Sequence, residues 1–266
     1  MADAWKVDIR IEERTGGRVA HVAIDNRAKL NCLGAGLMQE FIAKVTVLAA
    51  DPDLRVMVLT GAGEKSFVAG ANMLELKELE PASARAFLTL VHGVCRVCRE
   101  LPVPVIARIN GPCFGAGLEL AAACDMRVAA DTAVFGMPEV KLGLPSVVEA
   151  ALLPQLIGWG KTRILVYTGD TIDAATALAW GLVEKAVAPR DLDAAVEAWV
   201  AAIVESGPRA IRLQKELVRS WESMPLSDAI AEGIRCMGKA YESDEPRRMV
   251  EEGLAKLRAR KRQPPQ

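Results

Sequence analysis

The chain has 266 residues, about half of them hydrophobic, and its 33 lysine and arginine residues nearly balance its 34 aspartate and glutamate residues. A net charge near zero argues against a nucleic-acid binder that works through a global basic field. The first ten residues lack an apolar segment, so we expect no signal peptide, and the six cysteines show no disulfide framework. These features predict a reduced, cytoplasmic protein.

The N-terminal part of the chain alternates strand and helix patterns. Residues 7–13 and 19–25 flank a TGGR turn and predict a β-hairpin. Short apolar runs predict further strands at 55–61, 103–109 and 126–130. Helical patterns are expected at 36–50, 81–100 and 115–124. Strands that alternate with helices in this way indicate an α/β domain.

The last quarter of the chain is expected to be helical. Strand patterns stop after about residue 191, and four helical stretches follow, separated by Pro208 and Pro225. We therefore divide the chain into a core at 1–195, which contains the candidate site, and a helical region at 196–266.

Several kinds of site are not expected. The two histidines, His21 and His92, lie in strand and helix patterns away from any nucleophile motif, so we expect ordinary, partly buried side chains and no Ser-His-Asp mechanism. Cys95 and Cys98 form a C-x-x-C motif without a second pair, so no metal site is predicted. The longest apolar stretch, 105–124, contains charged residues and a proline and does not predict a membrane helix.

The segment INGPCFGAGLEL at 109–120 is the first candidate for chemistry. Gly115, Ala116 and Gly117 stand where a helix is expected to begin, and small residues let a ligand approach the backbone. The first N–H groups of a helix have no partner within it, and the helix dipole is positive there, so an oxyanion would be stabilised. Close packing of the helix against a neighbour also requires small residues, and both interpretations stay open on this motif alone.

Two glutamates and a second loop add to this candidate. Glu119 lies in an apolar helical pattern, where burial would raise its pKa towards the range useful for acid–base catalysis; the alternative is a solvated helix edge. Glu139 lies in a loop or strand end, where catalytic groups are common, although an exposed loop glutamate explains it better when taken alone. In the loop at 66–76, Ala71 follows Gly70 and offers another N–H group to an oxyanion.

Together these segments resemble the crotonase (enoyl-CoA hydratase/isomerase) superfamily along nearly the whole chain. The resemblance rests on ordered motifs: AIDNRAKLNCL at 23–33, SFVAGANMLEL at 66–76, the central segment at 107–144, and YTGDTIDAATALAWGLVEKAV at 167–187. It implies an α/β fold with a crotonase-like spiral of β-β-α units and a helical C-terminal region. That region implies assembly into homotrimers or hexamers, as dimers of trimers.

The resemblance also implies a complete site. The N–H groups of Ala71 and Ala116 would form an oxyanion hole, and Glu119 and Glu139 would be the catalytic glutamates. Residues expected to bind coenzyme A and the thioester are Lys29, Leu30, Ala69, Ala71, Asn72, Met73, Leu74 and Ala116. The implied substrate is an acyl-CoA thioester, with no metal and no cofactor other than the coenzyme A of the substrate, and with no nucleic-acid or membrane partner.

The sequence departs from the family pattern at points that bear on the site. Asn72 replaces the usual aspartate, and Ala116 replaces a common glycine while keeping its backbone N–H. After Gly143 the sequence LPSVVEAALLPQ is shorter than usual and lacks the glycines whose amides position water in hydratases. This turn introduces Glu149, which we expect to be a helix N-terminal charge with Ser146 as the N-cap, rather than a substrate-contacting acid.

The predicted reaction is the addition of water to a 2-enoyl-CoA thioester. By resemblance, Glu119 activates the water and Glu139 protonates Cα. Isomerisation, thioester hydrolysis and decarboxylation stay open, because the altered turn after Gly143 weakens the preference for hydration. An RNA-binding, non-enzymatic member of the superfamily is a further alternative, supported only by the basic residues Arg258, Arg260, Lys261 and Arg262.

Overall fold

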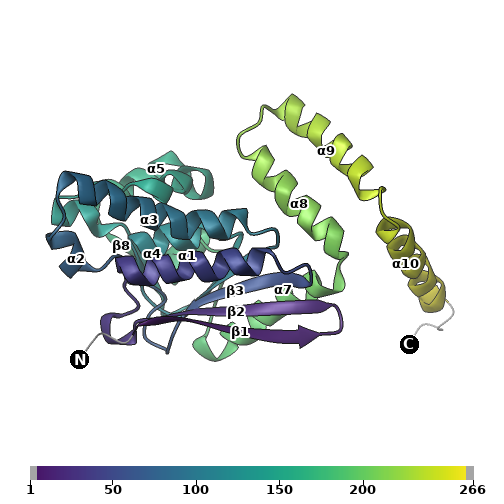
Figure 1. Cartoon of the computed structure of the whole chain (residues 1–266), viewed down its shortest axis with the longest axis horizontal. Coiled ribbons are helices and arrows are strands. Elements are labelled where there is room, and N and C mark those ends of the chain that lie inside the picture. Colours follow the sequence, from purple (N-terminus) through teal and green to yellow (C-terminus); the bar gives the residue numbers. More distant parts are fainter. Residues whose placement is uncertain (1–4, 262–266) are drawn as a thin grey trace. The chain divides into compact units, whose positions relative to one another are not determined.

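The computed structural model describes residues 5–261, and the chain divides into two compact units between Ala201 and Ala202. The first unit is a mixed α/β structure with a six-stranded and a three-stranded sheet (Figure 1). The second unit is helical. The predicted α/β class with a helical C-terminal region is therefore confirmed.

The main sheet has the strand order β1-β2-β3-β4-β6-β9. The predicted hairpin of β1 and β2 is confirmed, and each later neighbouring pair is parallel. Its strands are β1 (Lys6–Arg14), β2 (Gly17–Asp25), β3 (Leu54–Gly61), β4 (Val105–Ile109), β6 (Met126–Ala130) and β9 (Lys185–Val187). β3 and β4 are almost entirely buried, as continuous apolar strands of a parallel sheet are when both faces are covered.

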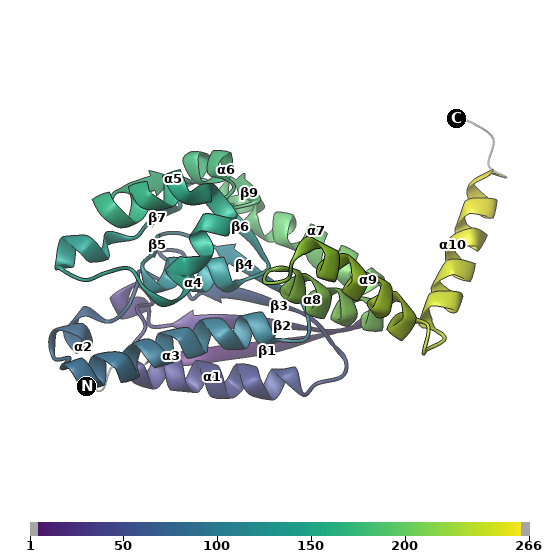
Figure 2. The same ribbon diagram turned by 90° about the horizontal axis from the view of Figure 1, so that it is seen from above.

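Two long helices cover one face of this sheet. α1 (Ala35–Ala49) and α3 (Pro81–Glu100) pack side by side (Figures 1 and 2). Their buried residues recur at helical spacing, as Leu37, Phe41 and Val45 do on α1. The short helix α4 (Ala116–Ala123) packs against α3, and every one of its residues is buried.

The remaining elements of the first unit are shorter or irregular. The small sheet has the order β5-β7-β8, with β5 (Cys113–Phe114), β7 (Val134–Gly136) and β8 (Thr171–Asp173). The other helices are α2 (Met73–Lys77), α5 (Leu153–Thr168) and α6 (Ala174–Trp180), with 3-10 turns η1 (Arg27–Lys29), η2 (Pro138–Leu142), η3 (Val148–Leu152) and η4 (Pro189–Asp191). The boundary between the two units falls within α7 (Leu192–Glu205). Sequence patterns did not identify α5, which is kinked at Gly158 with a φ of 78°.

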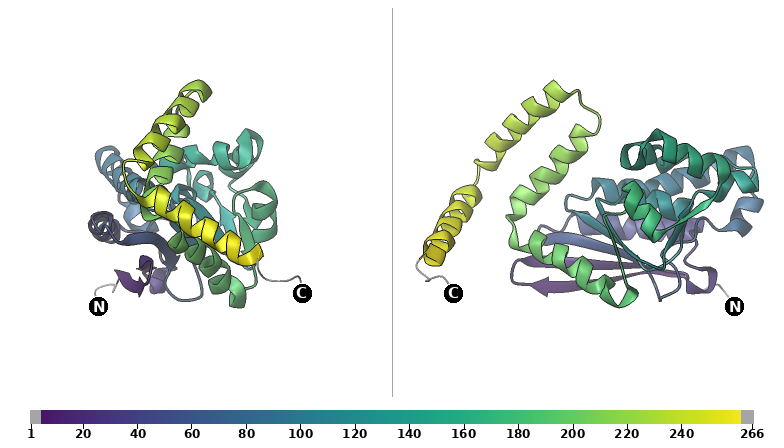
Figure 3. Two further views of the ribbon diagram at one scale, coloured as in Figure 1. Left: turned by 90° about the vertical axis from the view of Figure 1, so that its right-hand side faces the viewer. Right: turned by 180° about the vertical axis from the view of Figure 1, so that it is seen from behind.

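The second unit contains α8 (Pro208–Trp221), α9 (Leu226–Ala240) and α10 (Glu245–Lys261). α8 and α9 form a helical hairpin (Figure 3), in which the Trp221 indole N–H donates to the Ala229 carbonyl oxygen at 3.0 Å. Within residues 5–261, no helix is long and apolar enough to cross a membrane. Arg262 and the side chains of Arg260 and Lys261, which support the RNA-binding alternative, lie outside the described residues.

Gly117 offers a test of how α4 is packed. A Cβ atom at Gly117 would lie 2.0 Å from the Val68 carbonyl oxygen, whereas a Cβ at Gly160 in α5 would meet nothing within 4 Å. We expect Gly117→Ala to lower the free energy of unfolding by about 1–3 kcal/mol, because the backbone must move. The control Gly160→Ala should be neutral or raise it by up to about 1 kcal/mol. Urea denaturation measures the free energy of unfolding of both variants. Equal values for Gly117→Ala and the wild type would contradict this packing.

Candidate active site

A loop runs beside the segment that leads into α4. Val68 and Cys113 form a parallel bridge, and the Phe114 N–H donates to the Val68 carbonyl oxygen at 3.1 Å. Ala71, three residues after Val68, and Ala116, the first residue of α4, line the same cavity. Residues far apart in the sequence therefore meet at the helix N-terminus.

Among residues 5–261, neither the Ala71 N–H nor the Ala116 N–H makes a backbone hydrogen bond in the loops and caps around the site. Leu33 hydrogen-bonds to the residues on either side of Ala71, at 2.9 and 2.8 Å, so the Ala71 N–H points away from this pairing. Ala116 is the first helical residue, and the first backbone hydrogen bond within the helix begins at Glu119. Two donors are thus available to a ligand oxygen.

Glu119 is a buried carboxyl group in the first turn of α4. The residue is 4% exposed, and the Ala150 backbone N–H donates to its Oε1 atom at 3.3 Å. Burial, and next the negative charge of Glu139, raise the pKa of Glu119 to about 8, while the Ala150 N–H acts in the opposite direction. The interpretation as a solvated helix edge is wrong, and Glu119 holds a proton at neutral pH.

Glu139 is held against the beginning of the same helix. It lies in η2, is half-buried, and its Oε2 atom accepts a hydrogen bond from the Ser146 hydroxyl at 2.8 Å. A Cβ at Gly115 would lie 2.5 Å from Glu139 Oε1, and Gly115 has a φ of 50°, so this position requires glycine. Glu139 is therefore not a freely exposed loop residue.

One cavity of about 680 Å³ is lined by Ala71, Ala116, Glu119 and Glu139 together. Its volume is typical of a site for a small molecule. Much of its remaining wall is apolar and comes from α2, α3 and the turn after η2, including Leu76, Leu79, Phe87, Leu88, Leu142 and Leu144. The sequence did not mark α3 as part of the site, because cavity-lining and core-facing residues follow the same helical spacing.

The residues expected to bind coenzyme A divide into two groups. Ala69, Ala71, Met73 and Ala116 line the cavity, whereas Lys29, Leu30, Asn72 and Leu74 lie outside its lining. The Leu30 carbonyl oxygen nevertheless accepts a hydrogen bond from the Ala69 N–H at 3.1 Å. The loop that carries Lys29 and Leu30 is therefore directly beside the cavity wall.

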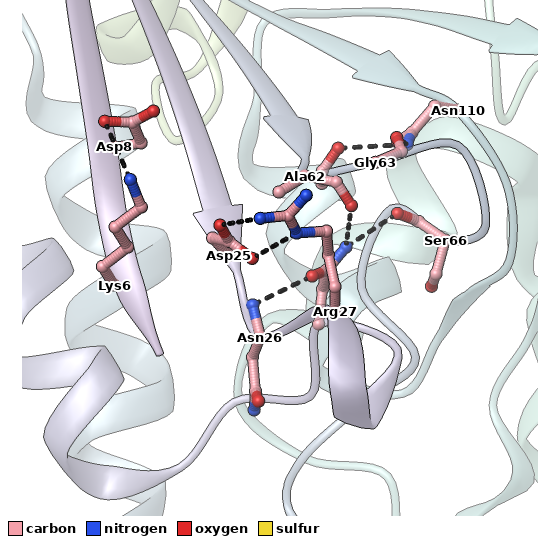
Figure 4. A network of polar contacts seen from close by, with 11 residues as sticks. Lys6, Asp8, Asp25, Asn26, Arg27, Ala62, Gly63, Ser66 and Asn110 are labelled. Atoms are coloured by element: carbon pink, nitrogen blue, oxygen red, sulfur yellow. Dashed lines mark hydrogen bonds and ion pairs between the residues drawn. The ribbon is translucent and has the colours of Figure 1, made fainter. Parts of the chain in front are cut away.

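A network of polar contacts holds this loop in place (Figure 4). The Asn31 side-chain amide donates to the carbonyl oxygens of Ala62 and Ser66 at 3.1 and 2.9 Å. Arg27 forms an ion pair with Asp25, with 2.8 Å between Nε and Oδ1. The Asn31 hydrogen bonds fix this loop to Ala62 and Ser66, which lie shortly before the cavity-lining residue Ala69 in the sequence.

Asn72 makes two side-chain hydrogen bonds, one of which an aspartate could not make. Its Oδ1 atom caps α2 by accepting from the Leu74 N–H at 3.1 Å, and its Nδ2 atom donates to Glu75 at 2.8 Å. The Glu75 carboxylate in turn accepts from the Ala35 N–H, the first of α1, at 2.8 Å. Because an aspartate would place a second negative charge beside Glu75, the amide suits this position.

The turn after Gly143 differs from its prediction. The expected N-cap at Ser146 is wrong, because η3 has Val147 at its N-cap without a side-chain cap and the Ser146 hydroxyl donates to Glu139. Glu149 lies in the first turn of η3, as expected of a helix N-terminal charge, but it is only 7% exposed and its Oε1 atom lies 2.7 Å from Nδ1 of His92. His92 was expected to be an ordinary histidine, and no sequence signal linked it to a residue 57 positions away.

A family model described as enoyl-CoA hydratase/isomerase matches residues 14–264 of this chain. The chain belongs to the enoyl-CoA hydratase/isomerase family. The resemblance predicted from the motifs is thus confirmed, and the protein is an enzyme of a family that acts on acyl-CoA thioesters.

Relatives and solved structures support this assignment. The short-chain-enoyl-CoA hydratase of Clostridium acetobutylicum is 35% identical over 230 residues, which cover 86% of this chain and 88% of the relative. The crotonyl-CoA hydratase of Syntrophomonas wolfei is 34% identical over 243 residues, which cover 91% and 94%. A crystal structure of enoyl-CoA hydratase from Bacillus anthracis is similar with a TM-score of 0.88 and 30% identity, covering 93% of this chain and 96% of that one. The crotonase-like fold is therefore confirmed.

The buried carboxyl group of Glu119 should make stability depend on pH. Its pKa is raised from 4.5 to about 8, so the stability contributed by the protonated form is complete below about 4.5 and is lost as the pH rises towards 8. Relative to Glu119→Gln, the free energy of unfolding of the wild type should fall by up to about 1.4 kcal/mol per pH unit across this interval. Urea denaturation of both proteins measures this difference, and parallel pH curves would contradict the raised pKa.

Proposed function

We propose that this chain is an enoyl-CoA hydratase, which adds water across the double bond of a 2-enoyl-CoA thioester. The observation that carries the proposal is the single cavity in which Glu119 and Glu139 lie with the two backbone residues Ala71 and Ala116. The names of the two relatives, a short-chain-enoyl-CoA hydratase and a crotonyl-CoA hydratase, support the same reaction.

In this proposal, the thioester oxygen is bound by the N–H groups of Ala71 and Ala116. The oxygen gains negative charge as the enolate forms, and each preorganised donor contributes about 3 kcal/mol to its stabilisation. The positive end of the α4 dipole lies at Ala116 and favours the same charge. The apolar wall from α2 and α3 suits the hydrocarbon part of an acyl chain.

The two glutamates divide the proton transfers. For hydration, Glu119 accepts a proton from the attacking water, and Glu139 protonates Cα. The raised pKa of Glu119 means that the resting site holds its proton on Glu119 at neutral pH. That form suits the reverse reaction, in which Glu119 protonates the leaving hydroxyl group and Glu139 removes the proton at Cα. In both directions the two glutamates carry one proton between them. It lies on Glu139 at the start of hydration and on Glu119 at the start of the reverse reaction.

The altered turn after Gly143 supplies polar groups in place of glycine amides. The backbone N–H groups of Val147 and Ala150 lower the pKa of Glu119 against the effect of burial, and the Ser146 hydroxyl binds Glu139. Both carboxyl groups are therefore oriented by this turn, which favours hydration over isomerisation, a reaction that needs only one positioned base.

The assembly and setting follow from the family resemblance. We expect a homotrimer or hexamer in the cytoplasm, with residues 196–266 as the oligomerisation region and no cofactor beyond the coenzyme A of the substrate. Exposed apolar side chains on α9 and α10, among them Ile230, Ile234, Met237 and Leu254, support such an interface. Light scattering of the purified protein tests this assembly, and a monomer would contradict it.

Incubation with a panel of 2-enoyl-CoA thioesters, followed by mass analysis, tests the function. Hydration adds the mass of one water, whereas isomerisation leaves the mass unchanged and hydrolysis releases free coenzyme A.

Glu119→Gln and Glu139→Gln should each slow turnover by on the order of 10²–10⁴-fold. Their combined loss should be less than multiplicative, because both act on one transition state. Near-normal turnover in either single variant would remove that residue from the mechanism.

The oxyanion hole is tested by removing a backbone donor. Ala116→Pro deletes the N–H at the first position of α4, where proline is tolerated, although it also restricts Gly115. We expect a loss of about 2.7–4 kcal/mol in transition-state stabilisation, measured as kcat/KM. Ala116→Gly keeps the N–H and should stay active as the matched control. A folded Ala116→Pro protein with wild-type turnover would show that this donor is not used.

A further inference from the structure

A third carboxyl group, Glu149, is buried beside Glu119. It lies on η3, which packs against α3 and α4. Its Oε1 atom lies 2.7 Å from Nδ1 of His92, and because a carboxylate only accepts, the imidazole N–H donates. Its Oε2 atom is buried and has no hydrogen-bond partner among the described residues. Most buried polar atoms are hydrogen-bonded, so this one calls for an explanation.

The groups around Glu149 act on its negative charge in opposite directions. The Cys95 thiol lies one turn beyond His92 on α3, and its pKa is raised well above the usual value by burial and next by the charge of Glu149. The same charge contributes, after burial and Glu139, to the raised pKa of Glu119. The groups that face Glu149 are thus an imidazole and a thiol from α3 and a carboxyl group from α4. A buried carboxylate next to another carboxyl group is a poor stabiliser of a fold, because its desolvation is only partly offset.

The backbone beside Glu149 is strained and reaches Glu119. Val148 has a φ of 38°, which is rare for a β-branched residue. Two positions later, the Ala150 N–H donates to Glu119. Strained conformations of this kind persist only where surrounding contacts hold them, and the hydrogen bond from His92 to Glu149 is such a contact.

We propose that His92 and Glu149 form a positioning pair for Glu119. His92 anchors the Glu149 carboxylate, and Glu149 in turn holds the backbone from Val148 to Ala150 so that the Ala150 N–H is directed at the Glu119 carboxyl group. Both side chains lie outside the lining of the cavity, so the pair acts through Glu119 and not on the substrate. The role in catalysis rests on the proposed hydration.

The test compares Glu149→Gln, His92→Leu and His92→Asn with a matched control. Glutamine keeps the size of Glu149 and removes its charge, and asparagine keeps an N–H donor near the position of Nδ1. The other histidine, His21, is also paired with a glutamate, with 2.8 Å between its Nε2 atom and Glu12 Oε2, but it lies in β2, so His21→Leu is the control. The measurements are kcat and KM across pH, the thermal unfolding midpoint, and a ¹³C carboxyl titration of Glu119.

We expect His92→Leu to lower kcat on the order of 10–100-fold, with little change in KM, because it displaces a group that orients a catalytic residue. Glu149→Gln should lower kcat by less, because the amide oxygen still accepts from His92. In Glu149→Gln, Glu119 should titrate at a lower pH, since one negative neighbour is removed, while the unfolding midpoint stays the same or rises. His92→Asn should recover most of the activity. The double variant His92→Leu/Glu149→Gln should be no slower than the slower single variant. His21→Leu should behave as the wild type.

Two outcomes would contradict the proposed positioning role of His92 and Glu149. One is wild-type kcat and an unchanged Glu119 titration in both Glu149→Gln and His92→Leu. The other is a lower unfolding midpoint without a change in kcat or in the titration, which would make the pair purely structural. If the wild type hydrates no enoyl-CoA, the proposed function fails instead. The Glu119 titration in Glu149→Gln still tests the pair in that case, because it needs no substrate.

Discussion

The burial of Glu119 in the first turn of α4 is the constraint on which the rest of the site depends. A carboxyl group that is 4% exposed and lies near a second carboxylate keeps its proton at neutral pH. A hydrogen-bond donor that orients such a group also lowers its pKa. The Ala150 N–H orients Glu119 in this way with one hydrogen bond, while the half-buried Glu139 is bound by the Ser146 hydroxyl. The two carboxyl groups therefore differ in burial and in their hydrogen-bond partners.

Close backbone packing determines where that helix begins. Gly117 lies against the Val68 carbonyl oxygen, and Gly115 lies against the Glu139 carboxyl group, so neither position has room for a side chain. Ala71 and Ala116 line the cavity beside this packing. One set of contacts therefore sets the position of both backbone donors and of both carboxyl groups. A displacement of a few tenths of an ångström in this packing would move all of these groups, because protein interiors are densely packed.

Long elements with one buried face could be predicted from the sequence. The hairpin of β1 and β2, the buried strands β3 and β4, and the amphipathic helices α1 and α3 show a period that local geometry imposes. The apolar surroundings of Glu119 likewise indicated its burial, and ordered motifs indicated the family. Short strands such as β5 and the kinked helix α5 have too few regular residues to show a period, so they escaped prediction.

The sequence by itself determined the α/β class, the family and the two glutamates to examine, because these depend on local periodicity and on motif spacing. Only the tertiary structure decided which polar atoms meet. Ser146 binds Glu139 instead of capping a helix, and Glu149 pairs with His92, 57 residues away. The Ala150 N–H donates to Glu119, which lies 31 residues earlier in the sequence. Such hydrogen bonds depend on how α3, α4 and η3 pack against one another, and this packing leaves no signal in the spacing of residues along one chain.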